Sequence, residues 1–151
     1  MISCIKKIQD SLIGRIYFSL TSFADKYIFS AVVFFMRFWI AKIFWYSGLT
    51  KISSWQSTVY LFKYEYAVPI IPAELAAAMA AATELSAPIF LILGLMTRIA
   101  AFPMLCMVAV IQFTYLDLID HLYWALLLLT IICYGPGRYS LDNLICCRIK
   151  K

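Results

Sequence analysis

Charged side chains are scarce in this chain, and their scarcity decides its class. Only 14% of the 151 residues are Asp, Glu, Lys or Arg, whereas 64% are hydrophobic and the mean hydropathy is +0.87. An ordinary soluble domain carries about 25% charged residues. The composition therefore excludes a typical soluble fold and predicts an integral membrane protein, and the length allows one domain.

Several residue types that redox and hydrolytic chemistry require are also missing. A single histidine excludes a haem held by two histidines of this chain, so no haem is expected. The five cysteines include no C-x-x-C pair, which leaves a dithiol mechanism unsupported, and we interpret all five as free thiols. No phosphate-binding loop, nucleophile elbow or metalloprotease motif occurs. The net charge of +5 does not indicate nucleic-acid binding, because the basic residues stand at chain ends and predicted turns.

Long apolar stretches predict an all-α fold: a polytopic membrane protein with a bundle of four transmembrane helices and amphipathic helices at the membrane interface. About 20 apolar residues cross a bilayer as a helix. The predicted spans are residues 30–49, 72–98, 99–115 and 118–134, with short interfacial helices near 55–66 and 140–149. The four-helix membrane domain is therefore placed at 30–144, after an N-terminal interfacial segment, 1–29, and before a basic cytoplasmic tail, 145–151.

The N-terminal segment has an amphipathic pattern and not that of a cleavable signal peptide. Ile8, Leu12, Ile16 and Leu20 recur at helical spacing, with charged residues between them. This pattern favours a helix lying on the membrane surface, and the alternative is an ordinary flexible lead-in.

The distribution of Lys and Arg predicts the orientation of the spans. Lys51 and Lys63 fall on one side of the predicted membrane domain. Nine basic residues fall on the other side: Lys6, Lys7, Arg15, Lys26, Arg98, Arg138, Arg148, Lys150 and Lys151. Because short cytoplasmic segments carry the excess of basic residues, both termini are expected in the cytoplasm.

One carboxylate, Glu84, lies near the middle of the second predicted span. Ala77, Ala80 and Ala81 share its helix face and let a neighbouring helix approach, so Glu84 is predicted to face protein. Pro88 follows one turn later and has no N–H to donate to the Glu84 carbonyl, so the helix is expected to bend there. A carboxylate at this depth has a function or a partner, and the simpler alternative is a protonated Glu84 hydrogen-bonded inside the bundle.

The first predicted span carries two candidate partners for Glu84. With a rise of 1.5 Å per residue, Lys42 and Glu84 both lie about 18 Å from the cytoplasmic side, and Arg37 lies roughly one and a half turns away. We therefore predict a buried ion pair of Glu84 with Lys42 or Arg37. Gln112, near the far end of the third span, completes this candidate intramembrane polar site.

A second candidate site lies in the turn before the fourth span, which the charge distribution places on the outer face. Asp117, Asp120 and His121 occur there. Their spacing is compatible with a metal site, but a helix cap at Asp117 and a favourable first-turn charge at Asp120 explain the same residues. No metal is therefore assigned to this site.

Several short motifs follow one another in a specific order and spacing. They are Arg37, Ser47-Gly48-Leu49-Thr50-Lys51, Glu84-Leu85, Leu93-Gly94-Leu95-Met96-Thr97-Arg98, His121-Leu122-Tyr123-Trp124-Ala125 and Gly135-Pro136-Gly137-Arg138-Tyr139-Ser140-Leu141-Asp142. In this arrangement the chain resembles the DoxX family of bacterial membrane proteins, over roughly residues 30–144. The resemblance implies a four-helix bundle in the bacterial inner membrane. It also implies an association with redox biology, because related DoxD and DoxA proteins form a thiosulfate–quinone oxidoreductase.

Two classes of function follow from these observations. The first is a small subunit or accessory protein of a quinone-linked membrane redox system, with a polar site around Glu84, a quinone as ligand and a membrane redox protein as partner. The second is a non-enzymatic membrane anchor, assembly partner or small-solute pathway in which the buried charges are structural. Both classes place the chain in a lipid bilayer, and both are compatible with a homo-oligomer. Neither class decides whether the chain is an enzyme. An enzymatic role would be that of an oxidoreductase subunit.

Overall fold

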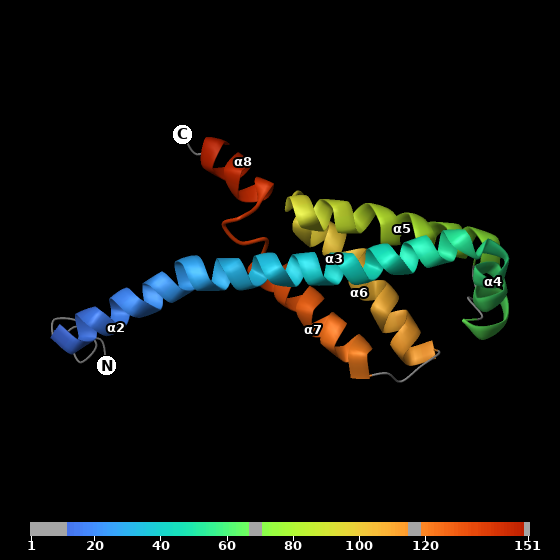
Figure 1. Ribbon diagram of the computed structural model, residues 1–151, viewed down its shortest axis with the longest axis horizontal. Helices are drawn as coiled ribbons and strands as arrows, with labels where there is room; N and C mark the ends of the chain where they lie inside the picture. Colours follow the sequence, from blue (N-terminus) through green and yellow to red (C-terminus); the bar gives the residue numbers. More distant parts are fainter. Residues whose placement is uncertain (1–11, 67–70, 115–118, 150–151) are drawn as a thin grey trace.

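A computed structural model describes residues 12–66, 71–114 and 119–149, and every regular element in these ranges is helical. The elements are α2 (Leu12–Phe23), the π-helical turn η1 (Ala24–Ile28), α3 (Phe29–Ser53), α4 (Trp55–Tyr60), the π-helical turn η2 (Leu61–Glu65), α5 (Ala73–Leu93), α6 (Thr97–Thr114), α7 (Ile119–Tyr134) and α8 (Leu141–Ile149) (Figure 1). The all-α prediction is confirmed for this part of the chain. Each of the four apolar stretches corresponds to one helix: α3, α5, α6 or α7.

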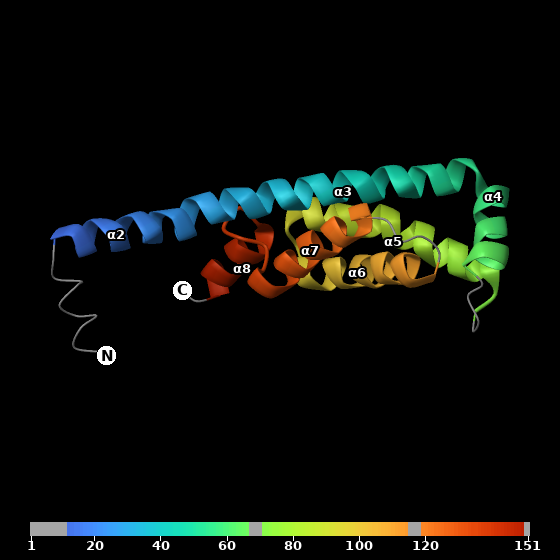
Figure 2. The same cartoon turned by 90° about the horizontal axis from the view of Figure 1, so that it is seen from below.

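The helices α2, η1 and α3 form one continuous rod (Figures 1 and 2). Phe23 and Ile28, at the two ends of η1, keep right-handed helical backbone angles. No glycine or proline stands between Leu20 and Phe29, so nothing in this stretch stops a helix. The predicted surface helix is therefore collinear with the first predicted span, and its residues 1–11 lie outside the described part of the chain.

The other apolar helices pack against the C-terminal half of this rod. In both views α5 follows α3, α4 turns across the far end, and α2 extends beyond the bundle in the other direction (Figures 1 and 2). α6 and α7 run at an angle to α3 in Figure 1. α5 runs antiparallel to α3, because Arg37 contacts Leu91 while Lys51, further along α3, contacts Glu84, which comes earlier in α5. The bundle is thus formed by α3, α5, α6 and α7.

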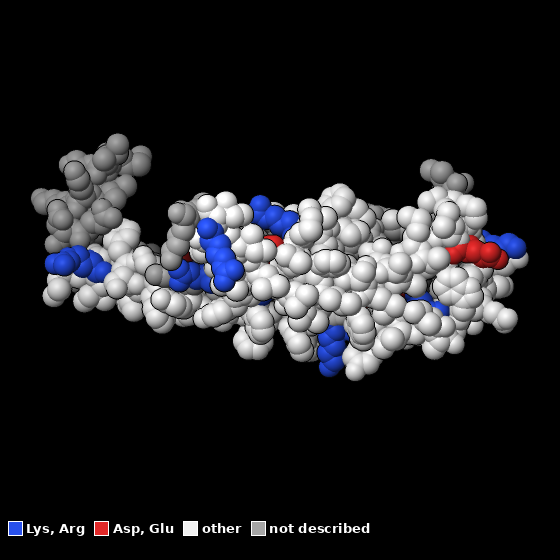
Figure 3. All heavy atoms as spheres, turned by 90° about the horizontal axis from the view of Figure 1, so that it is seen from above, with Lys and Arg blue, Asp and Glu red and all other residues white. Residues whose placement is uncertain are grey.

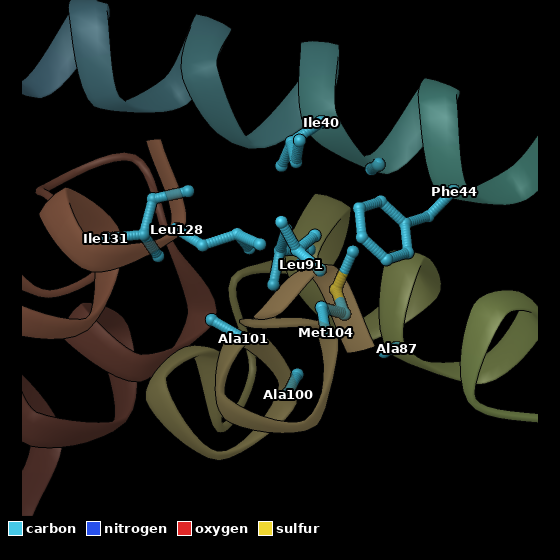
Figure 4. Packing of buried hydrophobic residues seen from close by; sticks show 11 residues of the cluster. Ile40, Phe44, Ala87, Leu91, Ala100, Ala101, Met104, Leu128 and Ile131 are labelled. Carbon is cyan, nitrogen blue, oxygen red and sulfur yellow. The ribbon is translucent and has the colours of Figure 1, made fainter. Parts of the chain in front are cut away.

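The core sits where these four helices meet (Figure 4). Ile40 and Phe44 from α3, Leu91 from α5 and Met104 from α6 are almost fully buried. Leu128 and Ile131 from α7, together with alanines from α3, α5 and α6, complete the cluster. Because alanine side chains are small, they let the helix backbones approach closely.

The outer surface of the bundle is also apolar. Phe35 and Trp39 on α3, Phe113 on α6 and Leu126 on α7 are all exposed. Figure 3 shows a mostly uncharged face on which Lys and Arg side chains are few and separated. α3 and α5 are each long and apolar enough to cross a membrane, and α6 and α7 are shorter apolar helices. These properties are those of membrane-type helices, and the four-span arrangement stays a prediction.

Candidate functional site

The contact between α3 and α5 positions Glu84. Gly48 on α3 faces this part of α5, and a Cβ there would lie 2.9 Å from the Leu85 side chain and 3.1 Å from Glu84 Cβ. Because glycine has no side chain, Gly48 lets α3 and α5 approach each other closely at Glu84. Glu84 itself is 2% exposed, and Ala77, Ala80 and Ala81 are buried beside it, as the pattern of small residues predicted.

The partner of Glu84 is Lys51. Lys51 Nζ lies 2.7 Å from Glu84 Oε1, and Ser47 Oγ donates a hydrogen bond of 3.2 Å to the same oxygen. Lys51 Nζ also donates to Ser47 Oγ over 3.0 Å. Ser47 and Lys51 are one helical turn apart, and a helical side chain leans towards the N-terminus, so both reach Glu84 from the same face of α3.

The predicted pairing of Glu84 with Lys42 or Arg37 is wrong. Lys42 is exposed on α3, and Arg37 is buried near the other end of α5, where its Nη1 donates to the Leu91 carbonyl over 3.4 Å. The prediction assumed that residue 30, at the start of the first span, lies at the same membrane depth as the cytoplasmic end of the second span. In the structure Arg37, about two turns further along α3, reaches that end, so Glu84 lies opposite Ser47 and Lys51.

Arg37 belongs to a separate group of contacts, which we call the turn cluster: Arg37, Gly94, Thr97, Ser140 and Asp142. Arg37 Nη2 donates to the Tyr139 carbonyl. Asp142 accepts hydrogen bonds from the backbone N–H groups of Met96 (2.8 Å) and Thr97 (3.1 Å), and so caps α6. The Asp142 N–H donates to the Gly94 carbonyl over 2.9 Å. These contacts tie the segment before α8 to the α5–α6 turn.

Gly94 is required in this cluster for two reasons. Its φ of +68° lies in the left-handed region that favours glycine. A Cβ at this position would lie 2.2 Å from Arg37 Nη1 and 2.6 Å from Ser140 Cβ. Two motifs far apart in the sequence, around Gly94 and around Ser140, therefore meet here.

Two cavities adjoin the Lys51–Glu84 pair. The larger, which we call the outer cavity, has a volume of about 460 Å³ and lies between α5, α6 and η2. The smaller, which we call the inner cavity, has a volume of about 240 Å³ and extends between α3, α6 and α7 to His121 and Trp124. Lys51, Tyr66 and Glu84 line both cavities. The ion pair thus stands at the junction of two spaces, each large enough for part of a small molecule.

Two buried polar atoms around these cavities have no hydrogen-bond partner among the described residues. They are Glu84 Oε2 and His121 Nδ1. His121 is 7% exposed, and its ring lies edge-on to Trp124 with 5.0 Å between the ring centres. Because a buried polar atom without a partner costs free energy, unpaired atoms lining a cavity indicate a missing ligand or water.

Tyr66 adds a hydroxyl group to the same junction. Burial raises the pKa of the Tyr66 phenol above its ordinary value, and the charges of Glu65 and Glu84 raise it further. Tyr66 is therefore a neutral side chain at physiological pH and can donate a hydrogen bond from its hydroxyl. The cavities consequently combine an ammonium group, a carboxylate, an imidazole and a phenol with apolar walls.

The other predicted site residues lie apart from this junction or outside the described residues. Gln112, on α6, is partly buried and lines neither cavity. Asp120 is exposed in the first turn of α7, and Asp117 lies outside the described residues. Within the described ranges, no three His, Cys, Asp or Glu residues form a group suited to a metal. The structure therefore brings together Glu84 and His121, which the sequence had placed in different sites.

Sequence reasoning missed Ser47, Lys51, Tyr66 and Trp124 as site residues. Ser47 and Lys51 at a spacing of four, with Gly48 between them, form a polar strip beside a close-approach position on α3. That spacing was an available signal, but Lys51 was interpreted as a basic residue beyond the span and as part of a family motif, and not as the partner of Glu84. Trp124 stood beside His121 in another of these motifs, whereas Tyr66 carried no such signal, because many aromatic residues in this chain stand in similar positions.

Comparison with known proteins gives one match. A family model described as DoxX matches residues 32–116, which include Arg37, the Lys51–Glu84 pair and the whole α5–α6 region. His121 and the segment from Gly135 to Asp142 lie beyond the matched range. No curated protein and no solved structure matches the chain.

Proposed function

Because the chain belongs to the DoxX family, we propose that it is a small subunit or accessory protein of a membrane redox system, and that its Lys51–Glu84 site binds the headgroup of a quinone. The observation that carries this proposal is a pair of buried polar atoms, Glu84 Oε2 and His121 Nδ1, that have no partner among the described residues and belong to side chains lining the inner cavity together with Lys51. A ligand that supplies hydrogen-bond donors and has an apolar body would satisfy both the polar atoms and the walls.

A quinone fits these groups in both of its redox states. The oxidised form presents two carbonyl oxygens, which accept hydrogen bonds from a donor such as the Lys51 ammonium. The reduced form presents two hydroxyl groups, which donate to acceptors such as Glu84 Oε2 and His121 Nδ1. The site therefore holds donors and acceptors for a ligand that exchanges one for the other on reduction.

The proposal includes a position in the membrane. α3, α5, α6 and α7 cross the bacterial inner membrane, and both termini are in the cytoplasm, because the basic residues gather on that side. The turn cluster lies at the cytoplasmic ends of α5 and α6, where Arg98, Arg138 and Arg148 are also found. The Lys51–Glu84 site lies nearer the outer surface, since Lys51 stands in the last turn of α3.

A second candidate function is a non-enzymatic anchor or assembly protein in which the ion pair serves only the fold. The observation that favours it is Glu84 Oε1, which already has two partners, Lys51 and Ser47. In that case the cavities would be filled by lipid or water. The same experiment separates the two functions.

The test is to purify the protein in a mild detergent, extract bound quinone and measure the amount per chain. We expect quinone with the unmodified chain and a loss of it in Glu84→Gln, which keeps the shape of the side chain. Lys42→Met is the matched control, because Lys42 is an exposed lysine on the same helix and should retain the quinone. Folding of each variant is checked by helix content and size-exclusion profile.

Lys51→Met alone leaves a buried carboxylate without its cation, which costs about 3–5 kcal/mol in soluble proteins. The double variant Lys51→Met with Glu84→Gln removes both charges and keeps the fold testable. Equal quinone content in this double variant and the unmodified chain would favour the anchor function. An unmodified chain that neither carries quinone nor takes up added quinone would reject the proposed ligand.

A further inference from the structure

A further hollow lies between α5 and α6 and adjoins the outer cavity. It has a volume of about 220 Å³. Its walls are Thr83, Ser86, Ala87 and Phe90 from α5, and Met96, Ile99, Ala100 and Pro103 from the α5–α6 turn and α6. Thr83 also lines the outer cavity, so the two spaces meet at that residue. We call the combined space the α5–α6 groove.

The groove is long and lies at the molecular surface. It follows α5 from Ala76 to Phe90, which is about 20 Å at 1.5 Å per residue. Met79 and Phe90 on one side and Val110 and Ile99 on the other are between 41% and 65% exposed. In a membrane these exposed apolar residues face lipid, so the groove opens sideways into the bilayer.

The groove is apolar except near the middle of its length, where the Lys51–Glu84 pair and Tyr66 line the outer cavity. Thr83 and Ser86 add hydroxyl groups, and both donate to their own helix, to the Met79 carbonyl (2.8 Å) and the Ala82 carbonyl (2.7 Å). Neither donor is therefore left for a ligand. The part of the groove from Thr83 to Phe90 is thus an apolar channel that begins beside the charged pair. This arrangement matches a molecule with a polar head and an apolar tail.

We propose that the ligand of the Lys51–Glu84 site is a lipid-soluble molecule whose long apolar chain lies in the α5–α6 groove and which enters the site sideways from the bilayer. This inference rests on the proposed function for the identity of the headgroup. From Thr83 to Phe90 the groove is about 10 Å long at 1.5 Å per residue, so a quinone ring held at the Lys51–Glu84 pair without a chain would leave this part empty. Because this part begins beside the pair, the chain of the same ligand is the fitting occupant.

The surrounding lipid limits how strongly the groove can bind. Lipid chains are as apolar as the groove, so moving a tail from the bilayer into it gains little hydrophobic free energy. Selection of the ligand therefore comes from the polar end, and the groove orients the tail and guides the headgroup to Glu84. Blocking the groove should weaken binding through steric overlap, and only for ligands that carry a chain.

The test compares two quinones and two variants in detergent micelles by equilibrium binding. The quinones share one benzoquinone headgroup, and one of them carries a decyl chain. Ser86→Phe places a large side chain in the groove, at an exposed position. Ala78→Phe is the matched control, since Ala78 is exposed on α5 but lines none of the three spaces.

We expect Ser86→Phe to weaken binding of the chain-bearing quinone by about tenfold, the size of a typical overpacking effect. Binding of the headgroup alone should not change, and Ala78→Phe should affect neither quinone. Partition into the micelle is the same for every variant, so the ratio between variants reports on the groove. If Ser86→Phe does not fold, Ile99→Trp narrows the groove from the side of α6.

Unchanged affinity of the chain-bearing quinone in a folded Ser86→Phe and in Ile99→Trp would overturn the groove while leaving the headgroup site in place. Loss of binding in Glu84→Gln for both quinones would show that the headgroup site remains valid in that case. If the unmodified chain binds neither quinone, both the groove and the proposed function are rejected. The two failures therefore have different signatures.

Discussion

The turn cluster and the Lys51–Glu84 site both bury charged side chains along the same α3–α5 contact. In the turn cluster, the terminal nitrogens of Arg37 donate to the Leu91 and Tyr139 carbonyls, and Asp142 accepts three hydrogen bonds from Met96 and Thr97. At the other site, Glu84 Oε2 and His121 Nδ1 are without partners among the described residues and line cavities. Arg37 Nε is also without a partner among the described residues, but Arg37 lines neither cavity. The first group therefore uses its charges mainly to hold backbone segments together, and the proposed function assigns the second to binding another molecule.

This comparison shows how to distinguish structural from functional charges in a membrane-type bundle. Burial alone does not separate them, because Arg37 and Glu84 are 1% and 2% exposed. The difference lies in what surrounds the charge: backbone carbonyls and helix ends around Arg37, and open volume around Glu84. Matched substitutions in the two regions therefore test whether the charges around Arg37 are structural and those around Glu84 are functional.

The largest expected effect concerns the membrane sides on which the two regions lie. Cys146 and Cys147 are exposed on α8, next to the turn cluster, and Lys63 is exposed on η2, near the other site. Two chains are compared in right-side-out vesicles. In a Lys63→Cys chain that lacks the native cysteines, an impermeant maleimide should label the new cysteine. In the unmodified chain, the same reagent should not label Cys146 or Cys147 until the membrane is permeabilised. Labelling of the α8 thiols in sealed vesicles would show that the chain has the opposite orientation in the membrane.

The next largest effect is loss of folding on substitution in the turn cluster. Gly94→Ala forces a Cβ into Arg37 and Ser140 and also places alanine at a φ of +68°. Gly137→Ala has the backbone strain alone, about 1–2 kcal/mol, because a Cβ there would lie 3.5 Å from the nearest atoms, in ordinary contact. We expect Gly94→Ala to reduce the yield of folded protein far more than Gly137→Ala. Similar yields would show that the contact with Arg37 and Ser140 is not needed.

A double-mutant cycle sharpens the assignment of Lys51 as the partner of Glu84. Glu84→Gln and Lys51→Met, singly and together, should show a coupling free energy within the range of about 0.5–3 kcal/mol that contacting residues give. The same cycle with Lys42→Met should give a coupling near zero, because Lys42 is exposed. Thermal or denaturant unfolding in detergent measures both cycles. Coupling to Lys42 equal to that with Lys51 would contradict the observed register of α3 and α5.

Removal of Arg37 should destabilise the protein without emptying the quinone site. Arg37→Met leaves the Leu91 and Tyr139 carbonyls without their donor, and an unsatisfied buried group costs about 1–3 kcal/mol. We expect a lower unfolding midpoint together with an unchanged amount of quinone per folded chain. Loss of quinone at full stability would instead place Arg37 in the binding site.

The smallest expected effect is that of His121. Its Nδ1 has no partner among the described residues, so His121→Phe, which keeps an aromatic ring against Trp124, should leave the unfolding midpoint nearly unchanged. Quinone affinity should fall by the value of one hydrogen bond, about 0.5–1.5 kcal/mol. Asp120→Asn, at the exposed neighbouring position, is the control and should change neither quantity. A stability loss without an affinity loss would make His121 a structural residue.

Much of the fold was predictable because local patterns determine it. The four apolar stretches correspond to α3, α5, α6 and α7, Gly94 ends α5 in the left-handed conformation, and the alanine face of α5 is buried together with Glu84. These features depend on residues within a few turns of one another. The motifs around Gly94 and Gly135 also indicated the family, which the match over residues 32–116 shows.

The arrangement of the site depended on contacts between helices that the sequence pattern does not contain. Helical periodicity gives the face on which Glu84 lies, but not the axial offset of α3 against α5, which the contact of Arg37 with the α5–α6 turn sets. Because of this offset, the partner of Glu84 is Lys51 and not Lys42, which the sequence had suggested. The packing of α7 likewise brings His121 to the inner cavity, and the fit of α5 against α6 leaves the groove. The sequence by itself therefore determined which residues are buried and where helices end, while the tertiary structure decided which charges meet and where space remains for a ligand.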